Sequence, residues 1–181
     1  VVLAVGRVLG LDIGGVDRLL LPGRPPFFAG LPSAFSLPAG RSSSVRAMGG
    51  GWVSVSLVAI ATAPTRPEVS RGLSPVFVRP EEVRIEIRGA GHSSREIHHI
   101  IPPDFPADRL LLVEVLTPSG NWSSWPPHKH DTDDMPDEAV LEEVYHYRFR
   151  RPEAWALPRI YRAEGTPPRA PLRRITRRRP A

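Results

Sequence analysis

The chain has 181 residues, 41% of them hydrophobic, which is enough for one ordinary domain or two small ones with a core. It contains no Cys, so disulfides, thiol nucleophiles and Cys-based zinc sites are excluded, and any metal must be held by His and carboxylate groups. Its apolar runs are short and broken by Gly, Pro or Arg, whereas a membrane-spanning helix needs roughly 20 apolar residues. We therefore expect a cytoplasmic protein with no membrane partner.

Positive charge is concentrated towards the C-terminal end. The net charge is +5, but residues 148–181 contain 11 Arg and 2 Glu, and the preceding 147 residues have 13 basic and 17 acidic side chains. The basic segment APLRRITRRRPA has no aromatic residue that could stack on bases. We expect no nucleic-acid partner, and we keep a polyanion-binding tail only as a third hypothesis.

Short apolar runs bounded by Gly, Pro, Asn or Asp predict strands along most of the chain. With 22 Pro residues, no window longer than about two turns keeps an apolar period of 3.6 residues, so helices are not expected. In chain order, the predicted strands are residues 1–5, 18–21, 34–37, 43–47, 52–61, 83–87, 110–117 and 142–149. Many short strands predict an all-β sandwich or barrel.

The segment GNWSSWPPHKHD, followed after an acidic loop by LEEVYHYRF, has the pattern of a metal site. On a strand, the period of two would place His128 and His130 on one face, where both imidazoles can reach one metal ion at about 2.0–2.1 Å. On the later strand Glu143, Tyr145 and Tyr147 would share a face. If the two strands pair, Glu143 is the third ligand and the two tyrosines line the same cavity.

Two alternatives accompany this interpretation. An isolated HxH is often coincidental, although the double Pro, the acidic loop and the carboxylate opening a Tyr-rich strand favour a site. Glu142, on the opposite face, is the alternative third ligand. The ligand types suit zinc, manganese, iron or nickel, so the residues alone leave the metal open.

Several segments together resemble the 5-deoxy-glucuronate isomerase family of bacterial inositol catabolism. They are GAGHSSREIHHI, FPADRLLLVEVLTPSGNWSSWPPHKHD, LEEVYHYRF and, in the first half, LPAGRSS and GGGWVSVSLVAIATAP, and they span roughly residues 18–160. GNWSSWPPHKHD is the most specific of them. The resemblance implies an all-β bicupin, with two cupin β-barrels in one chain and the metal in the second barrel.

The resemblance also implies four metal ligands. Two His and a Glu correspond to His128, His130 and Glu143, but a further His on a later strand has no counterpart, because the sequence leaves the family pattern after Tyr161. His146 would lie on the strand face opposite Glu143. We expect a chain truncated at both ends with an incomplete second barrel. Its expected parts are 1–65, the remainder of the N-terminal barrel; 66–109, a linker and bridging segment; 110–162, the first part of the metal-binding barrel; and 163–181, a disordered tail.

The function implied by the resemblance is the isomerisation of 5-deoxy-D-glucuronate to 5-dehydro-2-deoxy-D-gluconate in myo-inositol catabolism. A divalent metal, zinc or manganese, would polarise the carbonyl while a base that the sequence does not identify moves the proton. The expected partner is a small-molecule sugar acid, and a homo-oligomer is compatible with this function. The alternative is a noncatalytic cupin-like module that binds a sugar acid or metal.

Three further residues have expected roles near this site. Arg95 is the candidate for the substrate carboxylate, which Arg can bind bidentately, and a structural arginine is the alternative. Lys129, between the two His, would face away from the metal and support the strand. Asp131 is a candidate for orienting a ligand imidazole. Together with the ligands and the two tyrosines, these residues make up the predicted site.

Overall fold

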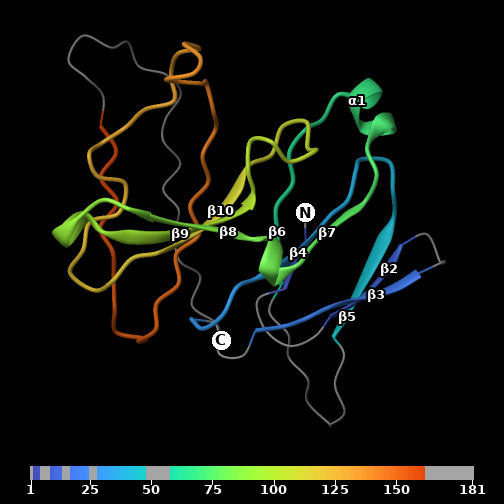
Figure 1. The fold of residues 1–181 in the computed structure, drawn as a ribbon, viewed down its shortest axis with the longest axis horizontal. Helices are drawn as coiled ribbons and strands as arrows, with labels where there is room; N and C mark the ends of the chain where they lie inside the picture. Colours follow the sequence, from blue (N-terminus) through green and yellow to red (C-terminus); the bar gives the residue numbers. More distant parts are fainter. Residues whose placement is uncertain (1, 5–8, 14–16, 25–27, 48–57, 162–181) are drawn as a thin grey trace. The chain divides into compact units, whose positions relative to one another are not determined.

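The computed structural model describes residues 2–4, 9–13, 17–24, 28–47 and 58–161 of the chain (Figure 1). Over these residues it has ten strands, one α-helix of six residues and two 3-10 turns, which confirms the all-β class. The elements are β1 (Val2–Ala4), β2 (Leu9–Ile13), β3 (Asp17–Leu21), β4 (Ser33–Ser36), β5 (Ser43–Ala47), β6 (Val58–Ile60), α1 (Pro67–Gly72), β7 (Val76–Val78), η1 (Pro80–Glu82), β8 (Arg84–Arg88), η2 (Gly91–Ser93), β9 (Arg95–Ile101) and β10 (Leu112–Leu116).

The chain divides into two compact units, Val1–Glu143 and Val144–Ala181. The ten described strands all belong to the first unit, where they form sheets with the orders β6-β1-β4-β7, β10-β9-β8 and β3-β2-β5. None of the described residues forms a helix long and apolar enough to cross a membrane. The predicted division into barrels, linker and tail stays a prediction, and the tail lies outside the described residues.

The four-stranded sheet packs on both faces. β4 and β7 are antiparallel, with Ala34 opposite Val78 and Phe35 opposite Phe77. Ala34 and Val78 belong to a hydrophobic cluster that includes residues of β9, whereas Phe35 and Phe77 pack with residues of β2 and β3. Because successive strand residues point to opposite faces, each face of this sheet packs against a different one of the other two sheets.

β9 is the central strand of its sheet and contributes most to the core there. Its residues Ile97, Ile100 and Ile101 are all buried. The pairing with β10 shifts between Leu112 and Val113, which lie opposite Ile101 and His99. This irregularity leaves Ile100 of β9 without an opposite residue on β10.

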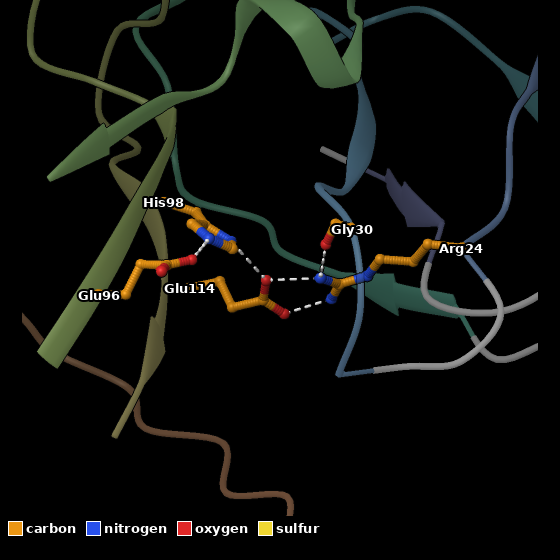
Figure 2. Close-up of polar contacts among 5 residues, drawn as sticks. All are labelled: Arg24, Gly30, Glu96, His98 and Glu114. Carbon is orange, nitrogen blue, oxygen red and sulfur yellow. Dashed lines mark hydrogen bonds and ion pairs between the residues drawn. The ribbon is translucent and has the colours of Figure 1, made fainter. Parts of the chain in front are cut away.

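A buried polar network joins the segment after β3 to this sheet (Figure 2). Arg24 makes a bidentate ion pair with Glu114 of β10, and its Nη1 also donates to the Gly30 carbonyl at 3.3 Å. The imidazole of His98 lies between two carboxylates, with Nδ1 3.1 Å from Glu114 Oε2 and Nε2 2.5 Å from Glu96 Oε1. Only 2% of His98 is exposed, so this histidine serves the interior of the fold.

Most predicted strands are confirmed to within a few residues. The runs 18–21, 34–37, 43–47, 83–87 and 110–117 correspond to β3, β4, β5, β8 and β10, and β1 lies within 1–5. Of the run 52–61, residues 58–60 form β6, and residues 52–57 lie outside the described residues. The prediction missed β2, β7 and β9.

The predicted strand at 142–149 is wrong, since the structure assigns no strand to these residues. Residues 128–130 are not in a strand either. Alternating side chains indicate which residues would share a face, but a strand also requires a neighbour that pairs with its backbone. The two segments are joined by a loop that contains an isolated β-bridge between Asp134 and Glu138, and across its ends the Leu141 amide donates to the His130 carbonyl at 3.3 Å.

Candidate metal centre

Three predicted ligands converge at the end of the first unit. Nε2 of His128 and Nε2 of His130 each lie 3.8 Å from Oε1 of Glu143. The ligand atoms of all three residues lie within 4.8 Å of one another. The two imidazole rings meet edge to face, with centroids 5.2 Å apart. The residue that the structure brings to the two imidazoles is thus Glu143 and not its neighbour Glu142.

These side chains fit a divalent metal by distance and by chemistry. Two ligands that each lie about 2.1 Å from an ion are about 3.4 Å apart at a tetrahedral angle, so the two His–Glu distances of 3.8 Å need to shorten by only a few tenths of an ångström. Two imidazoles and one carboxylate are a donor set that zinc and manganese accept. The His128, His130 and Glu143 side chains are 44%, 27% and 42% exposed, which leaves the centre open to an ion and a small molecule.

A backbone carbonyl fixes the orientation of His130. Its Nδ1 lies 3.2 Å from the carbonyl oxygen of Ala139. A carbonyl accepts only from an N–H group, so a hydrogen is on Nδ1, and in the neutral ring the lone pair is then on Nε2, the nitrogen nearest Glu143. This is the tautomer that a metal ligand requires. Ala139 could not be predicted from the sequence, because its contribution is a main-chain atom that every residue has.

The segment before the two histidines is anchored to the loop between β8 and β9. Gly120 has φ +84° in a turn closed by the bond from Asn121 N–H to the Pro118 carbonyl, a conformation that favours glycine. The Asn121 side chain then donates to the Ser94 carbonyl at 2.8 Å, and the Trp122 amide donates to the His92 carbonyl at 2.7 Å. The GNWSS motif thereby fixes the start of the segment that carries the two histidines.

Arg95 belongs to the same anchor. The residue is 8% exposed, and its Nη1 donates to the carbonyls of Ser93 and Trp125 at 3.0 and 3.5 Å. These contacts join the β8–β9 loop to the segment that leads to His128. They agree with the alternative that Arg95 has a structural role, and its binding of a substrate carboxylate stays a prediction.

Residues 131–141, which we call the acidic loop, connect His130 to the Glu142–Glu143 pair. Lys129 donates from Nζ to both carboxylate oxygens of Glu138, at 2.8 and 2.6 Å. Asp131 also contacts Glu138, through its backbone N–H at 2.7 Å, while the ligand imidazole is oriented by Ala139. Sequence reasoning missed Glu138, since nothing in an exposed acidic stretch distinguishes this carboxylate from its neighbours.

Tyr145 and Tyr147 lie in the second unit, on the same side of the chain. Their rings stack with centroids 6.1 Å apart and an angle of 9° between planes. The spacing of two residues therefore does place both rings together, as the sequence predicted. That they line the substrate cavity stays a prediction.

Two curated relatives show what the chain is similar to. It is 47% identical over 104 residues to the 5-deoxy-glucuronate isomerase of Geobacillus kaustophilus (strain HTA426), which covers 58% of this chain and 36% of the relative. It is 40% identical over 110 residues to the 5-deoxy-glucuronate isomerase of Bacillus subtilis (strain 168), covering 60% and 39%. The chain thus spans little more than a third of the length of these relatives.

A solved structure and a family model give the wider context. The crystal structure of an IolB-like protein from Salmonella typhimurium LT2 superposes with a TM-score of 0.56 and 27% sequence identity, over 77% of this chain and 50% of that one. This likeness agrees with an all-β, cupin-like fold. The sequence model of the KduI/IolB family matches residues 1–171, nearly the full length. The chain is therefore a member of the KduI/IolB family.

Proposed function

We propose that the chain carries the metal centre of a 5-deoxy-glucuronate isomerase, which converts 5-deoxy-D-glucuronate to 5-dehydro-2-deoxy-D-gluconate in the cytoplasm. The observation that carries this proposal is the convergence of His128, His130 and Glu143 within 4.8 Å of one another, in a chain of the KduI/IolB family. Relatives at 40–47% identity are named for this activity. The substrate class is then a small sugar acid.

The metal that we propose is zinc, with manganese as the second candidate. His128 and His130 would bind it through imidazole nitrogen and Glu143 through one carboxylate oxygen. When bound, a divalent ion supplies Lewis-acid polarisation of a carbonyl oxygen, which is what an aldose–ketose isomerisation requires. The residues of the chain supply the rest: the Ala139 carbonyl holds the His130 imidazole in one tautomer, and the exposed side of the three ligands is open to the substrate.

Three side chains are proposed to contact the substrate. Tyr145 and Tyr147 present two parallel rings, a surface that can pack against a sugar chain. Arg95 is proposed for the carboxylate group, in addition to its bonds to two backbone carbonyls. The role of Arg95 predicts a raised KM for Arg95→Lys, because Lys cannot bind a carboxylate bidentately.

The proposed function is tested by following turnover of 5-deoxy-glucuronate. Activity should be lost on chelation, return with added zinc or manganese, and be absent in His128→Ala. His92→Ala is the matched control, because His92 is exposed and contributes a backbone carbonyl to the fold. Turnover that survives both chelation and His128→Ala would refute the proposal. Metal binding without turnover would favour the noncatalytic metal-binding module.

A further inference from the structure

Four donor contacts converge on the carboxylate of Glu138. Lys129 donates to both of its oxygens, and the backbone N–H groups of Asp131 and Thr132 donate to Oε1 at 2.7 and 2.9 Å. The Lys129 ammonium and these two amides lower the pKa of Glu138 to about 2 from its usual 4.5. The carboxylate is therefore charged throughout the neutral range. All four contacts come from the residues that surround and follow His130, so they tie the end of the acidic loop to its beginning.

Closing the loop in this way brings its last residues back to His130. The residue after Glu138 is Ala139, whose carbonyl meets Nδ1 of His130 at 3.2 Å. Two residues further on, the Leu141 amide donates to the His130 carbonyl at 3.3 Å. The ring and the backbone of His130 are thus both held by residues that closely follow Glu138, namely Ala139 and Leu141.

We propose that Glu138 is a positioning residue for the metal centre: its carboxylate closes the acidic loop, so that the Ala139 carbonyl holds His130 with Nε2 directed to the metal. The proposal rests on the metal site of the proposed function and adds a residue that touches neither metal nor substrate. A carbonyl or carboxylate that holds the second nitrogen of a ligand His tunes both tautomer and affinity. Here that carbonyl is itself placed by a carboxylate.

The donors around Glu138 explain why a carboxylate is required. An amide at this position offers one oxygen and turns an NH₂ group towards either Lys129 or the backbone N–H groups. Glu138→Gln therefore loses the charge that attracts Lys129 and at least one of the four donor contacts, while it keeps the length of the side chain. Asp137→Asn is the matched control, since it removes the same charge one residue away, from a side chain that is exposed.

The experiment compares the full chain with its Glu138→Gln and Asp137→Asn variants in two measurements. The first is the ¹⁵N chemical shift of the His130 ring nitrogens in metal-free protein at mildly alkaline pH. The wild type and Asp137→Asn should show one tautomer with hydrogen on Nδ1, and Glu138→Gln should show a mixture. The second is zinc affinity by competition with a chelator, which Glu138→Gln should weaken about 10- to 100-fold and Asp137→Asn should leave within about twofold.

Each outcome decides the proposal. Unchanged tautomer and affinity in Glu138→Gln, or equal losses in both variants, would overturn it. If Glu138→Gln does not fold, Lys129→Met removes a donor in place of the acceptor and should show the same tautomer mixture. A wild-type chain that binds no zinc would count against the proposed function, whereas the tautomer measurement in metal-free protein still decides the role of Glu138.

Discussion

At the scale of the residue, burial decides how much an ion pair contributes to stability. The side chains of Arg24 and Glu114 are 5% and 18% exposed, whereas those of the surface pair Arg84 and Asp104 are 58% and 72% exposed. A buried charge that loses its partner keeps the cost of its own desolvation, but exposed partners return to water at little cost. The two pairs should therefore respond very differently to the same chemical change.

Glu114→Gln should lower the free energy of unfolding by about 3–5 kcal/mol, because the buried Arg24 guanidinium would then face a neutral amide. Asp104→Asn, which breaks the surface pair, should lower it by no more than about 1 kcal/mol. Urea unfolding of the full chain measures both values. Similar small losses in the two variants would show that the network of Figure 2 does not stabilise the fold.

The residue scale also shows what sequence could predict of the site. The spacing of His128 and His130 and the Glu that opens LEEVYHYRF were sufficient to name the three groups that the structure brings together. The groups that orient these ligands could not be predicted from the sequence. Ala139 acts through a main-chain carbonyl, and Glu138 is one carboxylate among several, so neither differs in type from residues without a role.

At the scale of the element, the loop between β8 and β9 depends on a glycine. Gly89 has φ +78°, and a Cβ there would lie 2.2 Å from the Ser93 carbonyl oxygen. The Ser93 carbonyl in turn accepts from Arg95, whose guanidinium also reaches Trp125 in the motif segment. Gly91, in the same loop, has φ +54° but no atom within 4 Å of such a Cβ.

The two glycines provide a matched pair of substitutions. Gly91→Ala should cost about 1–2 kcal/mol of stability, from the left-handed backbone alone. Gly89→Ala should cost about 1–3 kcal/mol more, because the backbone around Ser93 must also move. The comparison is made by urea unfolding under identical conditions. Equal costs at the two positions would mean that the close approach at Gly89 is relieved without strain.

Strand prediction succeeded for most of the short apolar runs that turn residues bound, and it missed β9. β3, β5 and β10 were found from short apolar runs. β9 was missed because apolar and polar residues do not alternate in its sequence, REIHHII. Both faces of this strand are buried, by hydrophobic packing and by the contacts of His98 with Glu96 and Glu114. Residues 142–149 show the opposite error: apolar and polar residues alternate clearly, but the segment forms no strand. A strand also needs a neighbouring strand to pair with, and the segment's own sequence does not show whether the fold provides one.

At the scale of the whole molecule, three observations together support a metal centre in this chain. The chain belongs to the KduI/IolB family over residues 1–171, the regular secondary structure of its described residues is mostly β, and it brings two histidines and a glutamate together. It spans little more than a third of the length of its curated relatives. The metal centre is therefore the part of the account that this chain can test directly.

The most direct test is the metal content of the purified full chain after dialysis against zinc or manganese, measured by mass spectrometry of the elements. The account predicts one ion per chain in the wild type, loss of most of it in Glu143→Gln, and full content in Glu142→Gln, whose carboxylate is the neighbour that does not meet the imidazoles. A wild-type chain without stoichiometric metal, or equal content in the two variants, would contradict the account.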